Sequence, residues 1–170
     1  MPLLATMSRD GGARFAALAN QLGISRSALA RSLEELSKAG WVARNPGHGH
    51  PLRPEYVLTG SGIPLAAWCE RVMEQRRSLR LEPKQLSRWS LPLVARLRRD
   101  PARFSALQSQ LAVTPRALSL TIRQMLSVEL VSRSVEDAFP PIAYYGLTGR
   151  GRRLAEAMGE AHPSPCPRAR

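Results

Sequence analysis

The stretch RFAALANQLGISRSALARSLEEL at positions 14–36 returns, with substitutions, as RFSALQSQLAVTPRALSLTIRQM at positions 103–125. Over positions 4–66, the same offset of 89 residues gives 21 identities in 63 aligned pairs without a gap. Self-similarity at a fixed offset means that each copy is one structural unit. The chain of 170 residues therefore contains two small domains in place of one medium domain.

Each copy predicts two short helices joined by a tight turn. In the first copy Phe15, Leu18 and Leu22 recur at helical spacing. Ser25 is a residue type that caps the N-terminus of a helix, and Gly40 is typical of the residue that follows one. We expect helices over 14–22 and 25–39, the second burying Leu29, Leu33 and Leu36, and in the second copy helices over 90–99, 102–111 and 114–127.

A β-hairpin and a further helix follow in both copies. The sequence predicts strands over 41–44 and 55–58 around a Pro- and Gly-rich loop, and strands over 130–135 and 143–147 in the second copy. Helices over 61–79 and 150–159 complete the units. This order is that of a winged helix-turn-helix domain. The fold class is therefore mainly α with small β-hairpin wings (α+β), as two tandem winged helix-turn-helix domains: 1–80 with a C-terminal linker helix, 81–160, and a disordered Pro-rich tail over 161–170.

The net charge limits the choice of partner. The chain carries 25 Lys and Arg against 13 Asp and Glu, a net charge of +12, and both halves are basic. Such an excess favours a polyanion, either nucleic acid or an anionic membrane surface. No run of 18 apolar residues exists, so no transmembrane helix is expected. Two cysteines and no secretory signal indicate a cytoplasmic protein with reduced thiols.

The second helix of each helix-turn-helix is the expected DNA-contacting element, because this geometry places its N-terminal part at the mouth of the major groove. Small or hydroxyl residues beside arginine allow close backbone approach and guanine recognition. For either helix alone, the alternative is an ordinary charged face exposed to solvent. The same arrangement of arginine with small or hydroxyl residues occurs in both helices of a basic chain, and this favours contact with DNA. The candidate DNA-binding residues are Ser25, Arg26, Ser27, Ala30, Arg31, Lys38, Arg44, His48, His50 and Arg53 in the first copy, and Thr114, Arg116, Ser119, Arg123, Gln124 and Arg133 in the second.

The second copy resembles the HxlR branch of winged-helix transcription regulators along its whole length. The residues that carry the resemblance are Trp89, Arg103-Phe104, Leu107, Thr114-Pro115-Arg116, Leu118-Ser119, Leu130-Val131-Ser132-Arg133, Tyr145, Leu147-Thr148 and Gly151. The first copy is similar to the same family or to its MarR-type relatives. The resemblance implies a bacterial transcriptional regulator that binds promoter DNA, usually as a homodimer of single-domain chains.

Three features depart from that family pattern. The chain is a tandem, so one polypeptide already holds two domains. Ser87-Arg88 precede Trp89 where oxidant-sensing relatives usually carry a cysteine, so a thiol sensor is not expected. The wings also differ, since the first holds the basic candidates His48, His50 and Arg53 whereas the second holds Glu136 and Asp137 with Phe139. Because acidic groups repel phosphates, the second wing is not expected to grip DNA as the first does.

Other candidate chemistry is weak. No acid–base, nucleophile or phosphate-loop motif points to an enzyme, and no cofactor is predicted. His48-Gly49-His50 lacks a third ligand nearby, which favours a wing tip over a metal site. Cys69 shares a helix with apolar residues and is expected to be a buried small hydrophobe. A small-molecule effector near Trp68 and Trp89 is an open alternative to simple packing.

We therefore expect a sequence-specific DNA-binding transcription regulator, a repressor, with the helices over 25–39 and 114–127 as two reading heads. It would act on double-stranded DNA in the cytoplasm, associated with the nucleoid. Homodimerisation through the helices over 61–79 and 150–159 is left open. The competing class is an architectural or scaffold protein that binds DNA without sequence preference or binds protein, because the fold alone does not decide function.

Overall fold

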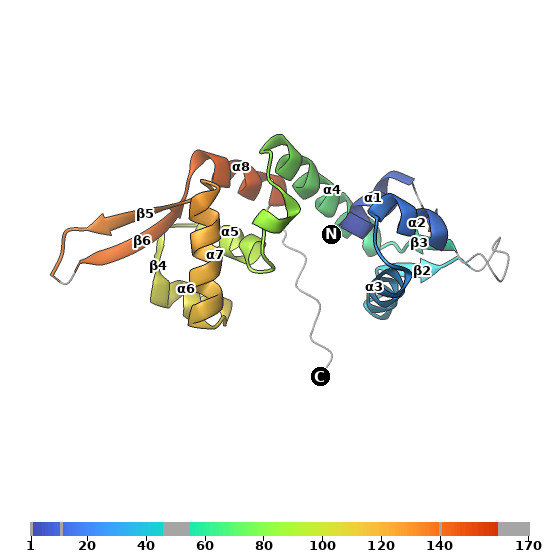
Figure 1. Cartoon of the computed structure of the whole chain (residues 1–170), viewed down its shortest axis with the longest axis horizontal. Helices are drawn as coiled ribbons and strands as arrows, with labels where there is room; N and C mark the ends of the chain where they lie inside the picture. Colours follow the sequence, from blue (N-terminus) through green and yellow to red (C-terminus); the bar gives the residue numbers. More distant parts are fainter. Residues whose placement is uncertain (1, 11, 46–54, 140, 160–170) are drawn as a thin grey trace. The chain divides into compact units, whose positions relative to one another are not determined.

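The computed structural model describes residues 2–10, 12–45, 55–139 and 141–159, arranged in two compact units (Figure 1). The first unit ends at Met73 and the second begins at Glu74. The domain boundary between residues 80 and 81 that the repeat suggests stays a prediction. The wing segment 46–54 and the C-terminal segment 160–170 lie outside the described residues.

The first unit has helix–turn–helix elements followed by a short hairpin. Its strands form one antiparallel sheet in the order β1-β3-β2, in which Ala13 pairs with Tyr56 and Val42 pairs with Leu58. The elements are α1 (Pro2–Asp10), β1 (Ala13–Arg14), α2 (Phe15–Leu22), α3 (Arg26–Lys38), β2 (Val42–Arg44), β3 (Glu55–Leu58) and α4 (Gly62–Ser78), the last of which continues beyond the end of the unit.

The second unit repeats this plan after a short 3-10 turn, η1. Its sheet has the order β4-β6-β5, with Ala102 paired to Tyr145 and Val131 paired to Leu147, the same registers shifted by 89 residues. The elements are η1 (Pro83–Gln85), α5 (Ser90–Leu97), β4 (Ala102–Arg103), α6 (Phe104–Leu111), α7 (Pro115–Ser127), β5 (Val131–Glu136), β6 (Ile142–Leu147) and α8 (Gly149–Met158). Figure 1 shows the β5–β6 hairpin extending away from the helices of its own unit.

Each unit has a core of leucine and methionine side chains from corresponding helices. Leu18, Leu29 and Leu33 are fully buried in the first unit. Leu107 and Leu118 occupy the matching positions of the second unit and are equally buried. Burying one such side chain contributes about 1.5–3 kcal/mol, so these residues hold the second helix of each pair against the first. The predicted fold class and its duplication are confirmed.

The recurring Leu-Thr-Gly-x-Gly segment closes each hairpin onto the helix that follows. The Thr148 amide donates to the carbonyl oxygen of Leu130 at 3.2 Å, and its hydroxyl donates to the carbonyl oxygen of Glu129 at 2.5 Å. The same hydroxyl accepts from the Gly151 amide at 3.1 Å, which caps α8. Thr59 makes the corresponding contacts to Trp41, Gly40 and Gly62.

The structure corrects several details of the sequence interpretation. The first repeat begins with α1, a helix that the pattern did not predict, and β1 and β4 are two-residue strands that were also missed. The strands expected to begin at Trp41 and Leu130 begin one residue later. Leu36, which was expected to be buried, is only half-buried. Leu130 is buried, whereas Trp41 at the matching position of the first unit is half-buried.

No helix among the described residues combines the length and the apolar character needed to cross a bilayer.

Candidate nucleic-acid interface

A left-handed residue and an N-cap define the turn of each helix-turn-helix. Gly23 ends α2 with φ 61°, and the Ser25 hydroxyl then accepts from the Ala28 amide at 3.2 Å to start α3. In the second unit Ala112 takes the same backbone conformation with φ 48°. The Thr114 hydroxyl accepts from the Ala117 amide at 3.3 Å and starts α7. The predicted capping role of Ser25 is confirmed, Thr114 has the same role in the second unit, and the caps fix where each second helix begins.

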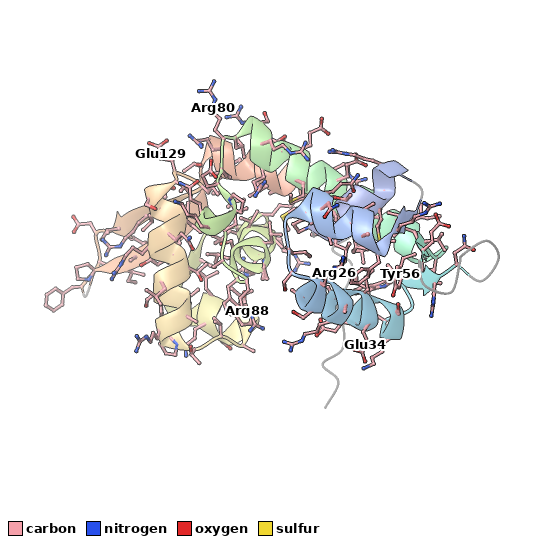
Figure 2. The ribbon with its side chains drawn as sticks, turned by 45° about the vertical axis from the view of Figure 1, so that its right-hand side comes forward. Arg26, Glu34, Tyr56, Arg80, Arg88 and Glu129 are labelled. Atoms are coloured by element: carbon pink, nitrogen blue, oxygen red, sulfur yellow. The ribbon has the colours of Figure 1, made fainter. Side chains whose placement is uncertain are left out.

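The face of α3 opposite its core side is exposed. Leu29 and Leu33 point into the unit, and the candidate residues on the other side are all accessible. Arg26 is the first residue of the helix, and Figure 2 shows it on the same helix as Glu34, whose side chain projects away from α2. The exposed candidates of this helix are Ser25, Arg26, Ser27, Ala30, Arg31 and Lys38.

One cation of this face already has a partner. The Lys38 ammonium lies 2.7 Å from the Glu34 carboxylate, one helical turn away. The hydrogen bond from Lys38 lowers the pKa of the Glu34 carboxyl, and the reciprocal hydrogen bond to Glu34 raises the pKa of Lys38. Both side chains are exposed, so the pair is weak. A phosphate that approaches Lys38 nevertheless competes with this carboxylate.

The corresponding face of α7 carries no acidic residue. Arg116, Ser119 and Arg123 are exposed, while Leu118 and Met125 are fully buried on the other side. Leu120 is also on the outer face and is 54% exposed. A large exposed leucine next to two arginines is suited to an apolar contact, such as the methyl group of thymine.

Gln124 has an intrachain role that the sequence did not predict. Its amide nitrogen donates to the carbonyl oxygen of Lys84 at 2.6 Å, and the side chain is only half-exposed. This candidate DNA-binding residue therefore links α7 to the turn η1. No helical pattern could have shown this contact, because Lys84 is 40 residues away in the chain.

A cluster of hydroxyl groups positions α7 within its unit. The Ser87 hydroxyl lies 3.2 Å from that of Thr121 and 3.2 Å from that of Ser90. Thr121 also donates to the carbonyl oxygen of Ala117 at 2.9 Å, and both Thr121 and Ser90 are buried. Buried hydroxyl groups that satisfy one another hold the start of α5 against the middle of α7.

Arg88 is a cation that the sequence interpretation missed. Its guanidinium stacks over the ring of Trp89 at 5.0 Å from the ring centroid, and the side chain is exposed (Figure 2). No sequence pattern indicates this residue, because the contact of its neighbour Ser87 with Thr121 of α7 joins residues 34 apart in the chain.

The described part of each wing exposes charged side chains. Arg133 is exposed on β5, followed by the exposed acidic pair Glu136 and Asp137. Phe139, near the tip, is completely exposed. Arg44 is exposed at the end of β2, and the remaining wing candidates His48, His50 and Arg53 lie outside the described residues.

The exposed faces of α3 and α7 differ at aligned positions. Arg31 of α3 corresponds to Leu120 of α7, and Glu34 corresponds to Arg123. The helices are therefore alike in fold and burial but differ in the chemistry that they expose.

Cys69 belongs to the core of the first unit. It is 2% exposed, and burial raises the pKa of its thiol. A thiol that is less ionised and covered is poorly reactive, as expected for a small buried hydrophobe. Among the described residues, no group of three His, Cys, Asp or Glu side chains is placed to hold a metal ion.

A family model described as HxlR-like helix-turn-helix matches residues 1–81 and, again, residues 86–162. The chain belongs to the HxlR-like helix-turn-helix family. It contains two copies of the family domain, so the repeat found in the sequence is a repeat of this domain. The chain is therefore a DNA-binding transcription regulator that carries the helix-turn-helix domain of this family twice.

Two solved structures are similar to about half of the chain. The reduced form of the transcriptional regulator YodB from B. subtilis is 25% identical, covering 49% of this chain and 78% of its own, with a TM-score of 0.41. A MarR-family transcriptional regulator from Enterococcus faecalis V583 is 26% identical, covering 51% of this chain and 74% of its own, with a TM-score of 0.43. No curated protein matches the chain.

Proposed function

We propose that this HxlR-like protein is a bacterial transcriptional repressor that reads promoter DNA through α3 and α7. One observation carries the proposal: a capped second helix of a helix-turn-helix, with arginines and small or hydroxyl residues on its exposed face, occurs in both units. Arginine is suited to guanine and to phosphate, and small neighbours allow the backbone to approach the groove. The protein acts on double-stranded DNA in the cytoplasm, on the nucleoid.

The two heads read different bases. Arg31 in α3 favours a guanine contact where Leu120 in α7 favours a methyl contact. At the next turn, Arg123 in α7 replaces Glu34 in α3. The operator is therefore an imperfect palindrome or a pair of unlike half-sites. A symmetric operator would present the same bases to both helices and would therefore match the exposed side chains of only one of them.

The wings contribute unequally to DNA affinity. The exposed pair Glu136 and Asp137 would lie near the phosphates if the second wing followed the backbone, at an electrostatic cost. Arg133, closer to α7, is the wing residue of the second unit that we assign to a phosphate. In the first unit Arg44, His48, His50 and Arg53 have this role.

A homodimer of tandems, associated through α4 and α8, would present four heads and double the protected length of DNA. A monomer would present two. The solution mass of the free protein distinguishes the two forms, and the length of the fragment that it protects from nuclease gives the number of heads engaged.

An architectural role is the second candidate, because a net charge of +12 also suits coating of DNA without sequence preference. Selection of bound genomic fragments, followed by competition with random duplex, separates the two functions. A regulator keeps its selected fragment against a large excess of random duplex, since specific binding exceeds non-specific binding by about a thousandfold or more. Loss of the fragment in proportion to the competitor would support the architectural role.

A further inference from the structure

The second unit contains a hollow between the end of α5, the base of the β5–β6 hairpin and α8. Its volume is about 610 Å³, within the range of small-molecule sites. Pro101 lines the hollow with an exposed apolar ring, whereas the lining residues Leu97, Leu147 and Ala155 are buried. Ser132 and Ser134 supply hydroxyl groups. The hollow lies within one unit and requires no contribution from the other.

Guanidinium groups make this hollow electropositive. Arg99 and Arg152 both line it and are exposed, and neither forms an ion pair with any residue that the structure describes. The nearby Asp100 carboxylate is already neutralised by Arg96, whose guanidinium lies 2.7 Å away. A third lining arginine, Arg98, donates to the carbonyl oxygen of Gly159 and is thereby held at the rim. Glu156 is the remaining acidic residue of the lining, so positive charge dominates.

The first unit does not repeat this chemistry. At the aligned positions Arg99 is replaced by Asp10 and Arg152 by Ile63. The third rim arginine does have a counterpart, Arg9, but it is paired with Glu70 at 2.8 Å. The unpaired guanidinium groups are therefore not a requirement of the fold, since the duplicated domain forms the same elements without them.

The hollow is also turned away from the expected DNA side of the hairpin. Side chains alternate between the two faces of a strand, so Ser132 and Ser134 lie on the opposite face of β5 from Arg133. Arg133 is the residue of this strand that we assign to a phosphate of DNA. A free ligand is thus favoured over the DNA backbone as the occupant of the hollow.

We propose that this hollow binds a small organic anion, a carboxylate or phosphate group attached to an apolar body. Arg99 and Arg152 hold the anionic group, the Ser134 hydroxyl donates to it, and the apolar body lies on the exposed ring of Pro101. Because the site touches the base of the second wing, occupancy adjusts the hairpin of that unit. The binding site itself does not depend on the proposed reading of DNA.

Titration of the full-length protein with defined probes, followed by amide NMR, tests the site. Benzoate and phenyl phosphate present the two anionic groups on the same ring, benzamide is the uncharged match, and inorganic phosphate is the anion without an apolar body. We expect saturable shifts of the Ser132, Ser134 and Gly146 amides with benzoate or phenyl phosphate. Benzamide and inorganic phosphate should bind at least tenfold more weakly, because each lacks one of the two recognised features.

Single-charge variants locate the binding. Arg99→Gln and Arg152→Gln should each weaken the preferred probe about tenfold. Arg153→Gln, which removes the same charge from an exposed neighbouring residue outside the hollow, should leave it unchanged. Equal losses in all three variants, or equal binding of inorganic phosphate, would overturn the proposal in favour of general attraction to a basic chain. If Arg152→Gln weakens binding of duplex DNA and leaves the probes unaffected, the residue contacts the DNA backbone and the proposal is also wrong.

Discussion

Gly62 lies directly against the backbone carbonyl oxygen of Trp41, since a Cβ added at Gly62 would come within 1.9 Å of that atom. The duplicated residue Gly151 has the same relationship to Leu130, with a distance of 2.0 Å. In each unit the helix after the hairpin therefore starts in contact with the residue before the first wing strand. This contact explains why both glycines are retained in the repeat.

Gly151→Ala should destabilise the second unit by about 2–3 kcal/mol, because the carbonyl of Leu130 is backbone and cannot move aside as a side chain would. Gly62→Ala should have a similar effect on the first unit. Urea denaturation followed by circular dichroism measures both.

Gly60→Ala and Gly149→Ala are the matched controls, since a Cβ at either residue meets nothing within 4 Å and neither has a positive φ. Their unfolding should stay within about 0.5 kcal/mol of the unmodified protein, as for ordinary surface substitutions. Equal losses for the variants and the controls would show that the close approach does not matter.

Ala112→Gly should stabilise the second unit by about 1 kcal/mol. Ala112 has φ 48°, a conformation that is strained for any residue with a Cβ, and the aligned residue of the first unit is already Gly23. The reverse change, Gly23→Ala, should destabilise the first unit by a similar amount. Calorimetric melting of both variants checks the opposite signs, and a shift in the same direction for both would refute the explanation.

Glu34→Gln should tighten DNA binding severalfold at low salt. The change removes an acidic group from the exposed face of α3 and releases Lys38 from its 2.7 Å ion pair. The gain should shrink as salt screens the charges. Glu74→Gln removes an equal charge from an exposed residue of α4 and is the control. An identical gain in the control would assign the effect to net charge alone.

Cys69 should react slowly with an aromatic disulfide reagent in the native protein and rapidly in guanidinium. Burial raises the pKa of the thiol, so at a given pH less of it is the reactive thiolate than for a free cysteine. The test uses Cys166→Ser, so that Cys69 is the remaining thiol. Release of a full equivalent within seconds under native conditions would contradict the buried placement.

Local chemistry made much of the fold predictable from the sequence. The second helix of each pair is defined by residues close together in the chain, namely the caps Ser25 and Thr114 and the apolar spacing around Leu29 and Leu118. The structure places the ends of both helices within one residue of the expected positions. The repeat supports each helix assignment, because the same pattern occurs twice at a fixed offset of 89 residues.

The features that the sequence did not predict depend on contacts between residues that are far apart in the chain. β1 consists of two residues that become a strand only because Ala13 pairs with Tyr56, far along the chain. The direction of Gln124 depends in the same way on the carbonyl of Lys84. For the candidate interface, the helices and their exposed arginines were predictable, and the i,i+4 spacing of Glu34 and Lys38 on a helix is typical of an ion pair. The contact of Ser87 with α7 was not predictable, because it joins residues 34 apart in the chain.

The most direct test of the central claim, that α3 and α7 both read DNA, is the affinity of four variants for one selected genomic fragment. Arg31→Ala and Arg123→Ala should each cost about 1–3 kcal/mol of binding free energy, because each removes an exposed guanidinium from a reading helix. Arg71→Ala and Arg153→Ala, which remove exposed arginines from α4 and α8, should cost much less. If the first two variants bind as the second two do, α3 and α7 are not the reading helices.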